Sequence, residues 1–219
     1  VNISGGTVTA GSLRHLGRNN AIVNLTGGTV DVAEVYHETA NDVANDSLTV
    51  NLDAGGLLRT NRMYLNRTGG TQPLVTHTFA LRFDGGTLKP LSADVVNLID
   101  EILVAPGAGG TLIWEGVIED GGALIDTDGF SANILRPLVH DAALVGIRDG
   151  GLTKQGVGTL TLQAVNTFTG PVRLTADTLA LVHPASNNII AAANFIDVQF
   201  GTVLDVTGLD NGPLTGTLV

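Results

Sequence analysis

The sequence predicts an all-β fold, a single-stranded parallel β-helix, on three observations. The phrase VNISGGTV at residues 1–8 returns almost unchanged as VNLTGGTV at residues 23–30, and repetition at this distance is typical of solenoids. Apolar and polar residues alternate on both sides of the Gly-Gly pairs, as in half-buried strands. The composition, with 29 glycines, 43% hydrophobic residues and 4% aromatic residues, favours many short strands. We expect one domain over residues 1–219, which would be a segment of a longer solenoid or a unit of a filament.

Weaker copies of the repeat continue along the chain. They read VNLDAGGLL, LRFDGGTLKP, GAGGTLIW, EDGGALID and RDGGLTKQG, and they begin at Val50, Leu81, Gly107, Glu119 and Arg148. The second glycines of the first five copies are Gly6, Gly28, Gly56, Gly86 and Gly110. Their spacing is uneven but always falls within the period of roughly 20–50 residues that marks repeat architectures. One coil is therefore expected to extend from each of these glycines to the next.

Each copy predicts two strands joined by a bend. In the second copy the inward positions are Val23, Leu25, Val30 and Val32. The glycines supply a bend where φ is positive and where a neighbouring backbone approaches closely. Stacked coils would bury the inward residues in one continuous core. The same alternation places four phenylalanines inward, namely Phe79, Phe83, Phe168 and Phe200.

Two segments interrupt the repeat. LSADVVNLIDEILVAP, residues 91–106, has an N-cap candidate in Ser92 or Asp94, and Pro106 ends the pattern. Its apolar residues have helical spacing, which predicts one short helix near residues 92–103. The polar segment HETANDVANDS, residues 37–47, has no pattern and is expected to be a loop.

Charge and composition exclude several function classes. The formal net charge of −10 repels phosphate backbones and anionic headgroups, so no nucleic-acid partner is expected. No uninterrupted apolar run reaches the ~20 residues of a membrane span, so no membrane insertion is expected. The chain has no cysteine, which removes disulfides and thiolate metal sites from consideration.

Residues 151–182, GLTKQGVGTLTLQAVNTFTGPVRLTADTLALV, contain the motif that is most informative about family. The segment resembles the autotransporter-associated β-strand repeat of large secreted bacterial proteins. The positions that match are Lys154, Gly156, Gly158, Thr159, Leu160, Leu162, Asn166, Thr167, Phe168, Thr169, Gly170, Leu174, Thr178, Leu179 and Leu181. Asp177 stands where the family usually has glycine, and Arg173 stands where it often has threonine.

This resemblance implies an exported parallel β-helix, usually right-handed, displayed on the cell surface or released from it. It implies no activity, and no catalytic or cofactor-binding residue can be carried over. The alternative for this segment is a phosphate-binding loop around Lys154. That interpretation fails because a strand-like sequence, TLTLQAV, follows where the motif needs a helix.

We therefore expect a non-enzymatic extracellular structural or adhesive protein, such as a surface stalk, an adhesin passenger or a fibre subunit. Strand phrases at both ends of the sequence predict self-association end to end through terminal coils. Two alternatives stay open. One is a carbohydrate-active β-helix, a lyase or a hydrolase, and the other is a module that binds surface glycans through exposed Trp114, Tyr36 or Tyr64, although a core position is favoured for these rings.

Asp126 and Asp128 are the candidates for a metal or catalytic site. Both belong to the segment IDTDGF, and a calcium ion is the cofactor such carboxylates would take. An ordinary Asp-Gly turn is the favoured interpretation. The five histidines are scattered without metal-ligand spacing and are not expected to bind a metal. The residues before Gly-Gly, among them Asp84 and Asp149, are expected to accept hydrogen bonds from their own turns.

Overall fold

A computed structural model of the chain describes residues 1–39, 45–69, 75–92, 95–105, 109–186, 189–190 and 192–209. Within these ranges the fold is all-β, with seventeen strands and no helix, and the strands join in one hydrogen-bonded sheet. The strands are β1 (Asn2–Leu16), β2 (Asn20–Thr39), β3 (Asp46–Asp53), β4 (Gly56–Arg59), β5 (Arg62–Arg67), β6 (Thr76–Lys89), β7 (Val95–Ile99), β8 (Ile102–Val104), β9 (Thr111–Asp126), β10 (Ser131–Ile134), β11 (Leu138–His140), β12 (Leu152–Gln155), β13 (Thr159–Leu162), β14 (Val172–Leu174), β15 (Thr178–His183), β16 (Ile196–Val198) and β17 (Val203–Leu209).

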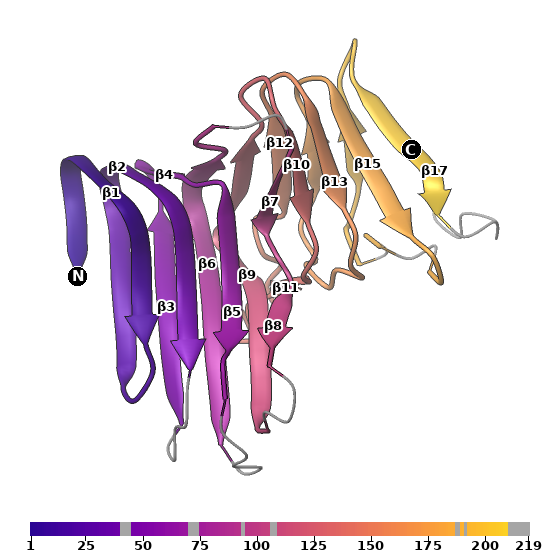
Figure 1. Ribbon diagram of the computed structural model, residues 1–219. Helices are drawn as coiled ribbons and strands as arrows, with labels where there is room; N and C mark the ends of the chain where they lie inside the picture. The colour runs from indigo at the N-terminus through magenta and orange to yellow at the C-terminus, as the bar shows by residue number, and fades with distance from the viewer. Residues whose placement is uncertain are drawn as a thin grey trace.

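Every pairing between these strands is parallel. Each strand pairs with a strand about one repeat later, so that β1 lies beside β2, β2 beside β3, β3 beside β6 and β6 beside β9. Figure 1 shows the result, in which the chain advances from the indigo N-terminal strands to the yellow C-terminal strand. Parallel strands cannot be joined by tight hairpins, and here repeat-length connections join them.

The core consists of apolar ladders made by equivalent residues of neighbouring repeats. Val23 lies beside Val50, and Val50 lies beside Leu81 in the next strand. In β3 and β6 buried and half-buried residues alternate along most of each strand. Phe79 pairs with Trp114, and their rings stack with centroids 4.0 Å apart. The alternation predicted from the sequence therefore determines which side chains face inward.

The Gly-Gly pairs lie at corners where neighbouring backbones almost touch. Gly28 has φ +76°, and a Cβ there would lie 2.6 Å from the carbonyl carbon of Gly5. A Cβ on Gly27 would lie 2.7 Å from the carbonyl oxygen of Ser4. The stack of glycines continues to Gly122, which lies beside Asp84 in the register of β6 with β9.

The predicted coil boundary at Gly110 is wrong. Gly110 immediately precedes β9, whose first residue, Thr111, lies beside Thr76 at the start of β6. The glycine corner beside Asp84 of β6 is formed instead by the Gly-Gly pair of the next repeat copy, at residues 121 and 122. The phrase GAGGTLIW thus matches the repeat in letters but leads into the start of β9, before this corner.

The helix predicted near residues 92–103 is wrong, since strands β7 and β8 occupy this segment. Asn97 lies beside Asn133, and Leu103 lies beside Asn66, so neighbouring strands supply the backbone hydrogen bonds. The helical spacing arose because two short strands are separated at Asp100. The side chain of Asp100 accepts a hydrogen bond of 2.8 Å from the backbone N–H of Glu101, and its carbonyl oxygen accepts one of 2.8 Å from Nε1 of Trp114.

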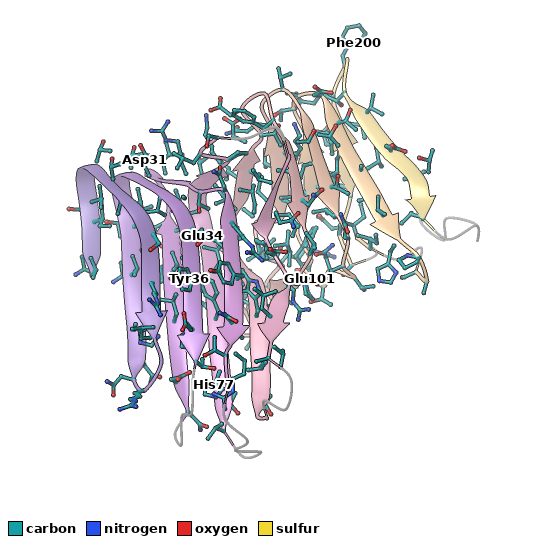
Figure 2. The ribbon with its side chains drawn as sticks, in the orientation of Figure 1. Asp31, Glu34, Tyr36, His77, Glu101 and Phe200 are labelled. Carbon is teal, nitrogen blue, oxygen red and sulfur yellow. The ribbon has the colours of Figure 1, made fainter. Side chains whose placement is uncertain are left out.

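Three of the four inward phenylalanines are confirmed, because Phe79, Phe83 and Phe168 are buried. Phe200 is fully exposed instead, at a relative accessibility of 107%. It lies in the turn before β17, where the period-two alternation stops (Figure 2). The loop predicted at residues 37–47 is wrong at both flanks, because residues 37–39 belong to β2 and residues 46–47 belong to β3, while residues 40–44 lie outside the described ranges. Across the described residues, no helix is long and apolar enough to span a membrane.

Candidate functional site

A cluster of polar side chains occupies inward positions where the repeats otherwise place Val and Leu. His37 lies near the end of β2, Asp46 opens β3, and His77 is the second residue of β6. Register brings them together, because Asp46 lies directly beside His77. All three side chains are fully buried. Figure 2 shows His77 near the lower end of the N-terminal strands, far from Phe200. We call these three residues the histidine–aspartate cluster.

One carboxylate oxygen holds the cluster together. Oδ1 of Asp46 lies 2.7 Å from Nε2 of His37 and 2.7 Å from Nδ1 of His77. Burial acts to raise the pKa of Asp46, but the hydrogen bonds and positive charge of the two histidines outweigh burial, so the pKa is lowered. With Asp46 ionised, both facing nitrogens must carry protons and donate to it.

A fourth side chain extends the cluster. His15 lies beside His37 in the register of β1 with β2. Their Nδ1 atoms are 3.0 Å apart, and the rings stack with centroids 4.8 Å apart. One of the two Nδ1 atoms donates this hydrogen bond and the other accepts it, according to which of them carries the proton.

Several polar atoms in this region have no hydrogen-bond partner among the described residues. They are Oδ2 of Asp46, Nε2 of His77, and Nε and Nη2 of Arg67. Arg67 is fully buried, and its Nη1 donates to Oγ1 of Thr39 at 3.1 Å. Each unsatisfied buried polar group costs about 1–3 kcal/mol. Such a concentration of unpaired atoms requires an explanation, and a bound ion or water is the usual one.

Sequence reasoning missed this cluster because it searched for short spacings such as His-x-x-x-His. The signal was present at the distance of the repeat. His15 and His37 are equivalent positions of the first two copies, just as Gly6 and Gly28 are. Asp46 and His77 are likewise one repeat apart, since they lie side by side in neighbouring strands.

The sequence-predicted pair Asp126 and Asp128 lies elsewhere. Oδ1 of Asp126 accepts a hydrogen bond of 2.9 Å from the N–H of Asp128, and Asp128 has φ +52°, which is the expected turn geometry. Nζ of Lys89 lies 2.9 Å from Asp126 and 3.4 Å from Asp128. The hydrogen bond to Asp126 raises the pKa of Lys89. The ammonium group therefore occupies the position between the carboxylates that a calcium ion would take.

Lys154 is buried and offers nothing to a phosphate. Its Nζ donates to Oγ1 of Thr127 at 2.9 Å and to the carbonyl oxygens of Gly156 at 2.5 Å and Ala176 at 3.1 Å. Burial lowers the pKa of Lys154, while Asp177 and Asp126 act to raise it. The ammonium group of Lys154 thus donates its hydrogen bonds to the protein's own backbone and to Thr127, at a corner of the fold.

Asp149 and Asp84, two of the three acidic residues that precede Gly-Gly pairs, behave differently from each other. Asp149 accepts a hydrogen bond of 3.0 Å from the N–H of Gly151 in its own turn, as predicted. It also accepts from the N–H groups of Gly170 and Thr169, at 2.8 and 2.7 Å. Asp84 instead accepts from Gly121 in the neighbouring turn, at 2.7 Å. Both carboxylates therefore accept hydrogen bonds from backbone N–H groups at corners of the fold.

The aromatic residues considered for glycan binding are buried or half-buried, since Trp114 and Tyr64 are buried and Tyr36 is half-buried. Tyr36 and Tyr64 form an outer stack with centroids 4.9 Å apart. The guanidinium groups of Arg14 and Arg62 lie 5.5 Å and 4.3 Å from the centres of these two rings. Because the rings pack against each other and against arginines, the stack resembles a structural ladder more than an open platform for a sugar.

No family model, no curated protein and no solved structure matches this chain.

Proposed function

We propose that this chain is a parallel β-helix of the autotransporter-associated repeat type, with a structural, non-enzymatic role at or outside the cell surface as a stalk or fibre subunit. One observation carries the proposal: the polar residues of the repeat signature bind backbone atoms of neighbouring turns. Lys154 does so through its ammonium group. Oδ1 of Asn166 accepts from the N–H of Leu138 at 2.8 Å, and Nδ2 donates to the carbonyl oxygen of Ile189 at 3.0 Å. Side chains engaged in this way hold turns together and are not free to act on a substrate.

The outer surface supports the same interpretation. Asn2, Asn24 and Asn51 form a ladder of side-chain hydrogen bonds of 2.7 and 2.6 Å between successive repeats. Asparagine ladders are typical of stacked parallel strands. Parallel pairing at repeat-length distances supports the coil arrangement of a solenoid, in which each repeat contacts only its neighbours.

We further propose that the fold associates end to end, in a heterologous contact between two copies of the chain. Among the described residues, β1 pairs with β2 alone and β17 pairs with β15 alone, so each has one free edge. Exposed apolar side chains lie at both edges, and they are Val8, Leu16 and Ile22 at one and Val198, Phe200 and Val203 at the other. Free strand edges with apolar side chains promote pairing with another chain.

The charge distribution favours this head-to-tail contact. The segment before Asp31 contains Arg14 and Arg18 and no acidic residue. After Arg173 the sequence contains no Lys or Arg, and its acidic residues are Asp177, Asp197, Asp205 and Asp210. Opposite charges towards the two ends of the sequence would orient the copies and suppress like-to-like contacts.

Gly5 supplies a more local argument. It does not have positive φ, and a Cβ there would meet nothing within 4 Å. Its equivalent in the next repeat, Gly27, must be glycine because Ser4 lies against it. If a second copy stacked on β1, its backbone would lie against Gly5 in the same way, and Gly5 would also have no room for a Cβ.

The test uses two variants that block opposite edges. Gly5→Val adds bulk at the β1 edge, and Phe200→Ser removes an apolar side chain at the β17 edge. We expect the unmodified chain to form elongated assemblies, visible by electron microscopy and sedimentation, and each variant alone to form fewer. Mixing the two variants should give dimers, because each retains one intact edge. Arg148→Glu, at an exposed arginine away from both edges, is the control and should assemble normally.

An unmodified chain that remains monomeric at all concentrations and salt levels would refute the association. Variants that assemble as well as the unmodified chain would refute the assigned edges. A glycan-cleaving activity in the purified chain would refute the non-enzymatic role.

A further inference from the structure

We propose that His37, Asp46 and His77 bind one divalent transition-metal ion, and that zinc fits this site best. Imidazole nitrogens and carboxylate oxygens are ligands that zinc takes in proteins, whereas calcium and magnesium prefer oxygen ligands alone. The three ligand atoms lie within 4.8 Å of one another and come from three different strands. This inference is independent of the structural role and of end-to-end association.

The cluster is close to the geometry that the ion requires. The two histidine nitrogens each lie 2.7 Å from Oδ1 of Asp46. Ligand atoms at about 2.1 Å from a tetrahedral zinc ion lie about 3.4 Å from one another. Replacing the two shared protons by a metal ion therefore needs an expansion of less than about 1 Å between each histidine nitrogen and the carboxylate oxygen. The ligand atoms lie within 4.8 Å of one another, so the two histidine nitrogens need to approach each other by no more than about 1.4 Å. The ligands are already on one inward corner, so binding does not require a new arrangement of strands.

His15 completes the surroundings of the site. A histidine that binds a metal through Nε2 carries its proton on Nδ1 and donates it to a nearby acceptor, which orients the ring. Nδ1 of His37 lies 3.0 Å from Nδ1 of His15, which can accept this hydrogen bond. Oδ2 of Asp46, which has no partner among the described residues, is available as the metal ligand or as an acceptor for a metal-bound water.

Arg67 opposes the ion and provides an independent test. Its neighbour in register, Thr39, is two residues beyond His37 on the same inward face of β2. Two residues along a strand span about 7 Å, so the guanidinium group belongs to the same buried corner. A positive charge in the same buried corner weakens cation binding. Removing it should therefore strengthen binding, whereas a merely structural cluster would show no such effect.

The experiment measures metal binding by the full chain after treatment with a chelator. Zinc is added in calorimetric titrations, and cobalt(II) replaces it for visible spectroscopy. We expect one ion per chain, proton release on binding, and d–d absorption bands of a nitrogen- and oxygen-ligated cobalt ion of low coordination number. The absence of cysteine means that thiolate ligands cannot produce the bands. Zinc should also raise the melting temperature.

The variants Asp46→Asn and His77→Gln should each weaken zinc affinity at least about tenfold and remove the cobalt bands. Arg67→Met should bind more tightly than the unmodified chain, a gain that unfolding cannot mimic. The control is His140→Gln. Nδ1 of His140 lies 2.7 Å from a carboxylate oxygen of Asp149, with no second histidine in that pair. Replacing His140 should leave zinc binding unchanged. Circular dichroism confirms that each variant keeps its β structure.

Absence of binding to the unmodified chain would overturn the proposal. So would binding that Asp46→Asn and His77→Gln leave intact, since the ion would then occupy another site. Binding lost equally in His140→Gln, or weakened in Arg67→Met, would also contradict the assignment. A cluster that binds no ion and only shares protons would give no cobalt bands and no zinc-dependent melting.

Discussion

Nζ of Lys154 donates a hydrogen bond of 2.9 Å to Oγ1 of Thr127, a residue of the preceding turn. Oγ1 of Thr127 also donates a hydrogen bond of 2.7 Å to the carbonyl oxygen of Val157. The two side chains thus fill the inside of a corner whose carbonyls point inward. An ammonium group with three donors suits this position better than any neutral side chain of similar length.

Replacing Lys154 with methionine should lower the free energy of unfolding by about 2–4 kcal/mol. Methionine retains much of the volume but leaves the carbonyls of Gly156 and Ala176 without this donor. Lys89→Met is the matched control, since Lys89 is the only other lysine and its ammonium group is partly exposed. It should cost less than about 1 kcal/mol. Urea unfolding measures both, and equal losses would contradict the corner role of Lys154.

Asp149 should make stability depend on acid pH. Burial acts to raise its pKa, but hydrogen bonds from Thr169, His140, Gly170 and Gly151 outweigh burial and lower it below the ordinary 3.8. The unfolded chain therefore binds the proton first as pH falls. The stability that the ionised group contributes is complete above about pH 4 and is lost as pH falls through the lowered pKa.

The variant Asp149→Asn tests this dependence. It should unfold more easily than the parent by about 2–4 kcal/mol at neutral pH, because an amide NH2 meets backbone N–H donors. The difference should shrink below pH 4. Asp205→Asn, at an exposed aspartate that accepts hydrogen bonds from Thr207, should change stability little. A difference between parent and Asp149→Asn that is the same at pH 3 and pH 7 would contradict the lowered pKa.

Tyr64 should lower stability at alkaline pH. Burial, Glu34 and Tyr36 raise its pKa to about 12. Between pH 10 and 12 the folded chain therefore keeps a proton that the unfolded chain loses, so stability falls as pH rises. In the variant Tyr36→Phe, Tyr64 is the only tyrosine. Its tyrosinate absorbance should still appear at higher pH in the folded protein than in urea, by somewhat less than about two pH units because the contribution of Tyr36 is removed. Coincident titrations would refute the shift.

Much of the fold was predictable because its signals are local. Alternation of apolar residues in segments such as 46–53 predicts an inward and an outward face, and the buried positions follow it. Asp-Gly and Gly-Gly pairs predict turns because they tolerate positive φ. The turn at Asp126 and Asp128 agrees with the sequence interpretation for this reason.

The features that were predicted wrongly or missed depend on contacts between residues that are distant in sequence. The apolar spacing around Leu98 and Ile99 fits a helix or two short strands equally well, and only the neighbouring strands β5 and β10 decide between them. Phe200 was placed by extending an alternation through a turn that stops it. Predicting the histidine–aspartate cluster required the register between repeats, because His77 meets Asp46 only when β3 and β6 lie side by side.

Gly28 should be far less tolerant of substitution than Gly6, although both have positive φ, +76° and +73°. A Cβ on Gly6 would meet nothing within 4 Å, so Gly6→Ala should cost only the left-handed backbone penalty of about 1–2 kcal/mol. Gly28→Ala carries the same penalty, and its Cβ would also lie 2.6 Å from backbone atoms of Gly5 and Gly6.

Backbone at a stacked corner cannot move aside as a flexible side chain can, so the two effects add. We expect Gly28→Ala to lower the free energy of unfolding by at least about 2 kcal/mol more than Gly6→Ala. Denaturation is measured at low protein concentration, where end-to-end contacts do not cover Gly6. Equal costs for the two variants would show that the corners are not in contact. A loss at Gly6 that grows with protein concentration would instead indicate that another copy covers this corner.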